Sequence, residues 1–315
     1  MGGDNAPTET VAGAVEASRR GVDVVLVGKH DILQAELARH STRLPIVDAP
    51  DVIEMGEDAA RALRDKPGAS ITVAAKLVAE ESADGMVSAG STGAAMAAAA
   101  IIIGRIKGVS RPSIASIFPT PGSPTVVLDS GANPDVRPEQ IVQFAIMGSV
   151  ASEVLLGTRD PRVGLLSIGE EKGKGRDLER AAYDLLEQAP IRFVGNVEGR
   201  DVANDKSDVI VTDGFTGNIF LKTMEGAALV VARYAMEELA KLDPEVQEAA
   251  LPALNSVRER LDYETYGGAQ LLGVKAVVVI AHGSSSRVAI ANALGVARDG
   301  AERDLPGRLS ERLSA

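Results

Sequence analysis

The chain has 315 residues, of which 45% are hydrophobic, so it is long enough to bury a large core. It contains no cysteine, which excludes disulfides, thiolate metal sites and a covalent acyl-cysteine intermediate. The net charge of −11 and an aromatic content of 3% argue against binding of nucleic acid. The longest apolar run, Ala94 to Ile103, is shorter than the roughly 20 residues that span a bilayer, and no signal peptide is evident. We therefore expect a cytoplasmic globular protein.

Short β-branched runs alternate with Ala-rich or amphipathic helical stretches along the chain. The predicted strands are, in chain order, VDVVLVG (22–28), DGMVSAG (84–90), SIASIF (113–118), TVVLDSG (125–131), RVGLLSIG (162–169), IRFVGN (191–196), DVIVTDG (208–214) and AVVVIAHGS (276–284). Between them, Pro138 to Leu156 carries apolar residues at helical spacing. This alternation predicts an α/β fold of three layers, with a mainly parallel sheet between helices, and we expect residues 1–315 to form one unit.

The alternation breaks from Leu239 to Tyr266. This stretch is charged, carries two prolines and has no strand signal, so we expect a helical arm or lid. Its apolar tip is predicted at Leu251 to Leu254, as a contact for the membrane or for a second subunit. The charged tail after Arg298 is expected to be peripheral.

Small polar residues follow nearly every predicted strand. In open α/β sheets ligands bind outside the carboxyl ends of the strands, so we expect these loops to form one functional surface. The loops are Ser88–Gly93, Asp129–Asn133, Ser167–Gly175, Gly195–Asp201, Thr212–Asn218 and Ala281–Ser286.

Two of these loops lead into helices that are suited to an anion. Ser91, Thr92 and Gly93 open an Ala-rich helix, whose first N–H groups and dipole favour phosphate; an ordinary N-cap is the alternative. After Asp213, helical spacing places Asn218 near a helix start and Lys222 one turn further on. The alternative for Lys222 is a surface pair with the glutamate three residues later.

His282 directly follows an apolar strand and precedes Ser284, which makes it either a candidate acid-base group or a hydrogen-bonded structural residue. The loop GEEKGKGRD carries Lys172, Lys174 and Arg176, as a phosphate clamp or a solvated turn. It does not match the P-loop pattern, and neither a dinucleotide-binding glycine motif nor a nucleophile elbow is present. Three scattered histidines without cysteine predict no metal site.

A set of motifs in order along the chain resembles a known family. The motifs are MGGDNAP, SAGSTGA, GRIKGVSRP, DSGAN, QFAIMGS, RVGLLSIGEE, GNVEGRD, DVIVTDGFTGN, LKTMEG, YGGAQLLGV and AHGSS. Together they are similar to the bacterial acyl-[acyl-carrier-protein]:phosphate acyltransferases of phospholipid synthesis, from Met1 to about Gly300. The pattern of Asp213, Gly217, Asn218 and Lys222 also resembles a turn of the phosphate acetyltransferases.

The resemblance implies a homodimeric α/β/α enzyme, with a fold related to phosphate acetyltransferases and isocitrate dehydrogenases. It implies transfer of a long acyl chain from acyl carrier protein to inorganic phosphate, without a cofactor, and delivery of acyl phosphate to a membrane acyltransferase. Family members are associated with the membrane while remaining soluble. Three positions differ from the family motifs: Asn5 replaces His, while Ser91 and Arg176 replace Asn. The family also carries a short hydrophobic strand before the first motif, so we expect such a strand ahead of Met1.

The chemistry suggests roles for these residues. Lys222 and the helix starts at Thr92 and Asn218 suit phosphate, Asn133 or Asn218 suits the oxyanion, and His282 suits protonation of the leaving sulfur. The remaining candidates for binding phosphate or acyl phosphate are Ser91, Gly93, Asp213, Gly217 and Ser284. Arg105, Lys107 and Arg111 are candidates for docking an acidic carrier protein, or an ordinary charged helix end. Two rival functions are a phosphate acyltransferase that uses short acyl-CoA and a non-catalytic scaffold that binds acyl groups or phosphate.

Overall fold

A computed structural model describes residues 1–120, 122–261 and 266–314, with the backbone alone described at 258–261. The strands are β1 (Leu26–Gly28), β2 (Ile46–Asp48), β3 (Gly85–Ser88), β4 (Ser113–Phe118), β5 (Thr125–Leu128), β6 (Arg162–Leu166), β7 (Arg192–Val197), β8 (Val209–Val211), β9 (Ala269–Leu272) and β10 (Val277–Ile280). Every predicted strand region contains one of them. The sequence reading missed β2 and β9.

The helices alternate with these strands. They are α1 (Thr8–Arg19), α2 (His30–Arg39), α3 (Ala59–Asp65), α4 (Ser70–Ala79), α5 (Thr92–Ala98), η1 (Ala99–Ile103), α6 (Pro138–Ala151), η2 (Ser152–Leu156), α7 (Asp177–Leu186), η3 (Gly199–Ala203), α8 (Gly214–Leu239), α9 (Pro244–Leu261), α10 (Arg287–Glu302) and α11 (Leu305–Ser314). The predicted helix from Pro138 to Leu156 is confirmed as α6 and its continuation η2.

The main sheet has eight strands in the order β3-β10-β9-β4-β5-β8-β6-β7. Two parallel blocks, β3–β10 and β5–β8–β6–β7, form its flanks. Between them, β9 runs antiparallel to both of its neighbours, and β4 runs antiparallel to β5. The prediction of a mainly parallel sheet is therefore confirmed, and these central antiparallel pairings are its exception.

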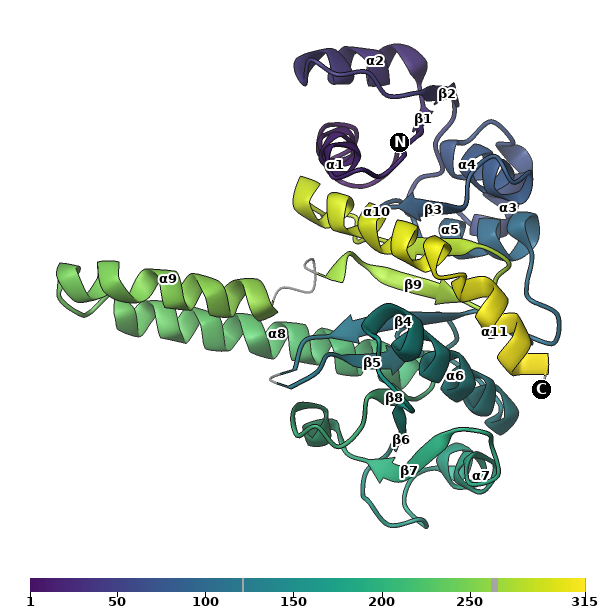
Figure 1. Cartoon of the computed structure of the whole chain (residues 1–315), viewed down its shortest axis with the longest axis vertical. Helices are drawn as coiled ribbons and strands as arrows, with labels where there is room; N and C mark the ends of the chain where they lie inside the picture. Colours follow the sequence, from purple (N-terminus) through teal and green to yellow (C-terminus); the bar gives the residue numbers. More distant parts are fainter. Residues whose placement is uncertain (121, 262–265, 315) are drawn as a thin grey trace.

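Helices cover both faces of this sheet (Figure 1). On one face, α6, α7, α10 and α11 pack on the strands, with Phe144 and Met147 of α6 fully buried. On the other face, the small residues Ala94, Ala95 and Ala98 bring α5 close to β9 and β10, while α8 crosses β5. The three-layer α/β/α prediction is confirmed.

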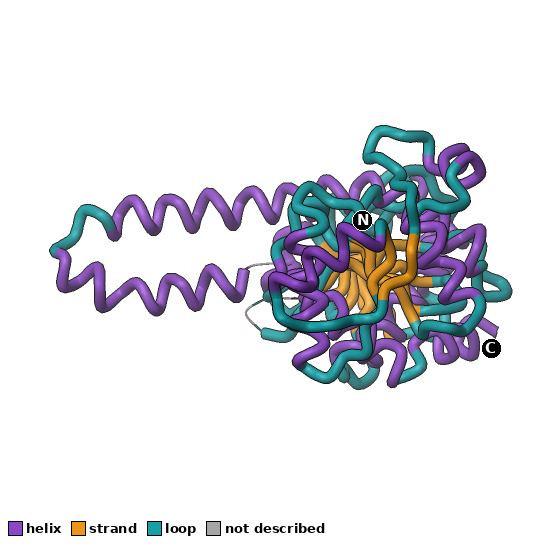
Figure 2. Tube along the Cα trace, turned by 90° about the horizontal axis from the view of Figure 1, so that it is seen from above, coloured by secondary structure: helices purple, strands orange, loops and turns teal. Residues whose placement is uncertain are grey.

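The predicted arm is a helical hairpin that projects from the body (Figures 1 and 2). It consists of the outer part of α8 and of α9, so it begins earlier in the chain than predicted; positions 262–265 lie outside the described residues. The turn between the helices is at 240–243. Leu251 to Leu254 are therefore in the middle of α9, and their prediction as the tip is wrong.

The tail after Arg298 is part of the core, contrary to the prediction that it is peripheral. Leu305 and Leu309 of α11 are buried against α6, and Arg312 forms an ion pair with Glu153. The leucine spacing of one helical turn is what places both side chains on the buried face.

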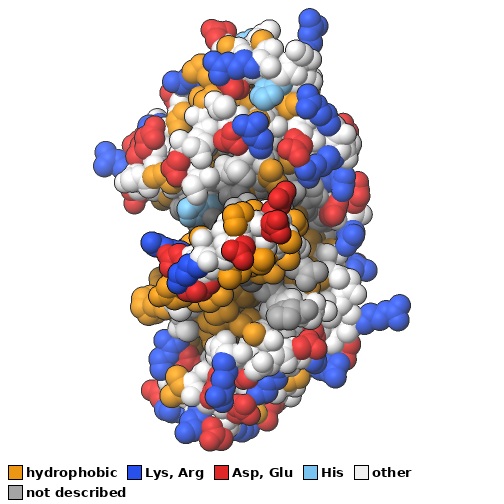
Figure 3. All heavy atoms as spheres, turned by 90° about the vertical axis from the view of Figure 1, so that its left-hand side faces the viewer, with side chains coloured by type: hydrophobic (Ala, Val, Ile, Leu, Met, Phe, Trp, Pro, Cys, Tyr) orange, Lys and Arg blue, Asp and Glu red, His pale blue; other side chains and the backbone are white. Residues whose placement is uncertain are grey.

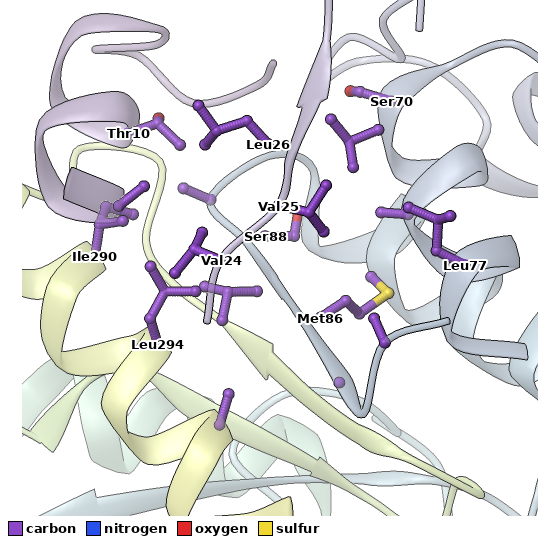
Figure 4. A pocket seen from close by; sticks show the side chains of 18 of the residues that line it. Thr10, Val24, Val25, Leu26, Ser70, Leu77, Met86, Ser88, Ile290 and Leu294 are labelled. Atoms are coloured by element: carbon purple, nitrogen blue, oxygen red, sulfur yellow. The ribbon is translucent and has the colours of Figure 1, made fainter. Parts of the chain in front are cut away.

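A cavity separates the first two strands from the main sheet. β1 and β2 form a parallel pair of their own, and a cavity of about 930 Å³ lies between β1 and β3 (Figure 4). Apolar side chains such as Leu26, Leu77, Met86 and Leu294 line it. The ammonium group of Met1 also lines it and lies 3.2 Å from the Val27 carbonyl, and burial lowers its pKa.

We predict that an extended apolar segment of five residues fused ahead of Met1 fills this cavity. It would bury two or three apolar side chains and replace a desolvated ammonium group with a peptide bond, so the melting temperature should rise by at least about 5 °C. Thermal unfolding followed by circular dichroism measures this. A Gly-Ser segment of the same length is the control, and equal melting temperatures for both fusions would contradict the prediction.

Candidate active site

The polar loops at the strand ends form two groups rather than the single surface that we predicted. The antiparallel pairings in the centre of the sheet reverse the strand direction, so β3 and β10 end at one edge and β5 to β8 end at the other. We call 2–5, 88–93 and 281–286 the histidine loops. We call 129–133, 167–176, 195–201 and 212–218 the aspartate loops.

Close backbone contacts hold the histidine loops together. Ser88 is the register partner of Ile280, so the loops that follow β3 and β10 are neighbours. The N–H of Asp4 donates to the Gly283 carbonyl at 2.7 Å, and the Asn5 amide donates to the Ser284 carbonyl at 3.2 Å. The small polar Asn5, at the position of the family histidine, therefore still anchors the loop.

The exposed groups of the histidine loops are candidates for chemistry. His282 and Ser284 are exposed, and the His282 Nδ1 lies 2.7 Å from the Ser284 Oγ. Ser91 is the N-cap of α5 and accepts from the Ala94 N–H at 3.3 Å, as the N-cap alternative predicts. Thr92 and Gly93, in the first turn of α5, are exposed. His282 and Ser284 on one loop and Ser91 to Gly93 on the next thus lie in adjacent loops. The structure brings these five predicted site residues to the same end of the sheet.

Among the aspartate loops, the buried carboxylate of Asp129 organises the turn after β5. It is fully buried and accepts the backbone N–H groups of Ile114, Gly131, Ala132 and Asn133 at 2.8 to 3.2 Å. Burial raises the pKa of Asp129, and these N–H donors oppose that rise. The sequence analysis did not single out Asp129, although its place directly after a fully buried strand was a usable signal.

Asp213 holds the start of α8. Its carboxylate caps the helix by accepting the Thr216 N–H and the Thr216 hydroxyl, each at 2.8 Å, and it is paired with Arg176. Burial alone would raise the pKa of Asp213, but Thr216 and Arg176 together hold it below the usual value. Arg176 also pairs with Glu179 of α7, so it joins the loop after β6 to α8.

Three of the predicted ligand residues have structural contacts instead. The side-chain amide of Asn133 already donates to Pro112 and Asp129, which argues against its role as oxyanion donor. The Asp213 carboxylate occupies the start of α8, where it would repel phosphate. Gly217 is buried, and a Cβ there would overlap the Asp129 carbonyl, so this glycine permits close packing.

α8 connects the two groups of loops. It starts in the aspartate loops and crosses the sheet face, so Lys222 lies about 12 Å along its axis from Gly214. The chain returns from the hairpin to the body near Gly268. This glycine packs against the Ile280 carbonyl, since a Cβ on it would lie only 2.8 Å away, and Ile280 precedes His282 by two residues. Lys222 therefore lies on the helix that runs from one group toward the other.

Asn218 and Lys222 are both exposed on α8, while the pairing alternative for Lys222 is observed. The Lys222 Nζ lies 2.9 Å from the Glu225 carboxylate. The described part of the chain shows no hydrogen bond to the Asn218 side chain, which lies against Gly131. An amide in this position can donate to a bound ligand.

The loop at 167–176 is held by its own charges. Lys172 pairs with Asp184 and Glu187 of α7, and Arg176 pairs as described above. Lys174 forms no ion pair within the described residues. Two of the three cations thus fasten the loop to the rest of the protein. The loop is therefore neither a free phosphate clamp with three available cations nor a simple solvated turn.

Three further observations bear on the site. Arg105, Lys107 and Arg111 lie exposed on the loop between η1 and β4. Within the described residues, no group of three or more histidines or carboxylates is placed to hold a metal ion. No helix in that part of the chain is long and apolar enough to cross a membrane.

Comparison with solved structures defines the class of fold. A phosphotransacetylase from Streptococcus pyogenes superposes with a TM-score of 0.64 at 18% identity, over 94% of this chain and 92% of that chain. The chain therefore has the fold of the phosphotransacetylases, as the resemblance implied.

Sequence comparison then assigns the family. The model of the family described as fatty acid synthesis protein matches residues 1–308. Phosphate acyltransferases of Desulforamulus reducens and Heliobacterium modesticaldum are each 47% identical, over 99% of this chain and 95% and 96% of the relatives. The chain belongs to this fatty acid synthesis family.

The contact between Arg176 and Asp213 gives a prediction that depends on pH. Arg176→Ala leaves the buried Asp213 carboxylate without its cation, and we expect a loss of about 1–2 kcal/mol in unfolding free energy at pH 7. Because the pKa of Asp213 is lowered in the folded state, this stabilisation is present above its ordinary pKa and is lost as pH falls through the lowered value. Urea unfolding at several pH values measures it. A difference between the two proteins that stays constant down to pH 2 would contradict this account.

Proposed function

We propose that the chain transfers a long fatty acyl group from acyl carrier protein to inorganic phosphate, giving acyl phosphate for phospholipid synthesis. Membership of the fatty acid synthesis family and 47% identity to proteins named phosphate acyltransferase support it. The structural observation that supports it is that the exposed α5 start and the exposed His282 and Ser284 lie in the loops that follow the paired strands β3 and β10. That arrangement offers N–H and hydroxyl donors to a small dense anion.

The site must bind phosphate, stabilise the oxyanion of the tetrahedral intermediate and protonate the leaving sulfur. A phosphate oxygen attacks the thioester carbonyl, the C–S bond breaks, and the thiolate takes a proton as acyl phosphate forms. Thr92 and Gly93 present backbone N–H groups to phosphate, and Lys222 supplies a cation. We assign the oxyanion to a further backbone N–H of the α5 start, because Asn218 lies against Gly131 among the aspartate loops, at the opposite strand ends from His282. His282, whose Nδ1 lies 2.7 Å from the Ser284 Oγ, suits protonation of the leaving sulfur.

The choice of donor separates this proposal from its alternatives. Purified protein is supplied with phosphate and either long-chain acyl-carrier protein or short-chain acyl-CoA, and acyl phosphate is trapped with hydroxylamine. Faster turnover of the carrier-protein donor supports the proposal. Preference for short acyl-CoA supports the first rival, and ligand binding without turnover of either donor supports a scaffold.

A substitution can show whether Lys222 contacts phosphate or only forms its ion pair with Glu225. Lys222→Ala should raise the KM for phosphate and lower kcat, by a combined loss of about 1.5–3 kcal/mol, since a charge-assisted contact to phosphate is removed. Melting temperature should change little, because the lysine side chain is 49% exposed. Steady-state kinetics at varied phosphate concentration measures the loss.

Glu225→Gln is the matched control, because it breaks the same pair and leaves the lysine in place. We expect near-normal phosphate affinity for this variant. If both variants lose activity equally, Lys222 acts through the pair and has no contact with phosphate.

A homodimer formed through the arm is part of the proposal. Leu229, Val231 and Tyr234 of α8 are 72%, 63% and 64% exposed, and the intervening Val230 is exposed as well. Consecutive residues of a helix point about 100° apart, so the hairpin leaves this part of α8 uncovered on several sides. Figure 3 shows apolar side chains gathered on the projecting arm and beside its base. A surface of this kind marks a contact with another molecule, and a second copy would cover it.

Membrane contact is assigned to α9 in the same proposal, since acyl phosphate must reach a membrane acyltransferase. We predict that Leu251→Asp combined with Leu254→Asp abolishes sedimentation with liposomes, because charge is placed on exposed Leu251 and on half-buried Leu254 beside it. The dimer and the activity with soluble donor should persist, whereas Leu229→Asp should yield monomers. Analytical ultracentrifugation checks both, and dissociation of the α9 variant would make α9 a subunit interface.

A further inference from the structure

We infer that the loop at 104–112, together with Lys275, is a preformed basic surface on which the acidic carrier protein docks during acyl transfer. This inference rests on the proposed function and adds a residue from a distant part of the chain to the three cations of the loop. Its ligand is the protein that carries the acyl group, recognised by complementary charge.

Four exposed cations meet at this surface. Arg105, Lys107 and Arg111 are on the loop, and the Lys275 N–H donates to the Gly104 carbonyl at 3.0 Å. The Lys275 Nζ lies 3.7 Å from the position of a Cβ on Gly104, so its side chain lies along the loop.

These cations are unpaired although carboxylates are abundant in the chain. The sequence has 44 acidic residues against 33 basic ones, and cations such as Arg162, Lys172, Arg176 and Lys206 form ion pairs, whereas others, such as Arg43 and Lys174, form none with a described residue. None of the four cations of the surface forms an ion pair with any described residue. Like charges held together repel one another, and an acidic partner would relieve that repulsion.

Hydrogen bonds and a buried side chain hold the loop at 104–112 in place. The Gln143 side chain of α6 donates to the Gly108 carbonyl at 2.9 Å and accepts from the Ser110 N–H at 3.0 Å. The Arg105 guanidinium donates to the Ser110 carbonyl across the loop, while Ile106 is buried beneath it. A surface ordered before binding loses little conformational entropy when a partner docks.

The surface also adjoins the aspartate loops. The Pro112 carbonyl, at the end of the basic loop, accepts from the Asn133 amide at 2.8 Å. Ile101, 66% exposed, lies in the helical turn that leads into the loop and offers an apolar contact beside the cations. An acidic helical partner that docks here is placed next to the aspartate loops, at the end of the helical segment α5–η1 that begins in the histidine loops.

Lys275→Glu tests the inference, because Lys275 belongs to none of the loops assigned to phosphate chemistry. We expect the KM for long-chain acyl-carrier protein to rise about tenfold, with kcat and the KM for acyl-CoA unchanged. The effect should shrink at 0.5 M salt, since exposed charges are screened. Arg43→Glu, an exposed cation between α2 and β2, is the matched control and should leave both donors unaffected.

Gln143→Ala tests the rigidity of the loop without changing charge. It should raise the KM for the carrier-protein donor by a smaller factor and leave acyl-CoA turnover unchanged. Equal effects of Lys275→Glu and Arg43→Glu would overturn the inference, as would loss of activity with both donors. Reduced sedimentation with anionic vesicles at an unchanged carrier KM would instead make the loop a lipid contact.

A direct binding measurement separates this inference from the proposed function. Fluorescence anisotropy of labelled, acyl-free carrier protein reports docking without any turnover. If wild-type protein binds the carrier and Lys275→Glu weakens that binding, the surface stands even when neither donor is turned over. If wild-type protein transfers acyl groups from the carrier but the Lys275→Glu variant binds it normally, the proposed function stands and the surface is wrong.

Discussion

The buried carboxylate of Asp129 is the interaction on which the rest of the candidate site depends. It accepts three backbone N–H groups and the Asn133 amide of the turn that leads the chain from β5 to α6, together with the Ile114 N–H of β4. The Asn133 carbonyl in that turn accepts the Gly214 N–H, and the Asp129 carbonyl packs against Gly217. The start of α8, and hence the position of Asn218 and Lys222, is therefore set by a fully buried group.

The reversal of strand direction in the centre of the sheet explains why α8 must cross the whole face of the sheet to link the two groups of loops. The reversal at β9 and β4 places the histidine loops and the aspartate loops at opposite edges of the sheet, so loops alone cannot form one site. A helix that starts at one edge and crosses the face carries side chains from one group toward the other. Its continuation beyond the sheet produces the arm, so a single element serves both the candidate site and the proposed dimer and membrane contacts.

The sequence predicted the elements better than their arrangement. Apolar runs such as SIASIF and TVVLDSG identify strands because their burial is a local property of the pattern. The pairing partners of β9, and thus the strand reversal, depend on contacts between distant segments that a single sequence does not contain. Short, half-buried β2 carried too few apolar residues to be seen, whereas the leucines of α11 had a helical spacing that was masked by the surrounding charges.

The same limit applies to the site. The residue types at the strand ends indicated where ligands bind, but the competition for each polar group is visible only in three dimensions. Asn133, Asp213 and Gly217 match a functional motif and yet are engaged by protein groups, so part of that motif encodes the geometry of the turn. The start of α8 must be positioned precisely, because a small displacement there is carried along the helix to Lys222. The exposed residues that the turn presents, such as Asn218, then remain the candidates for substrate contact.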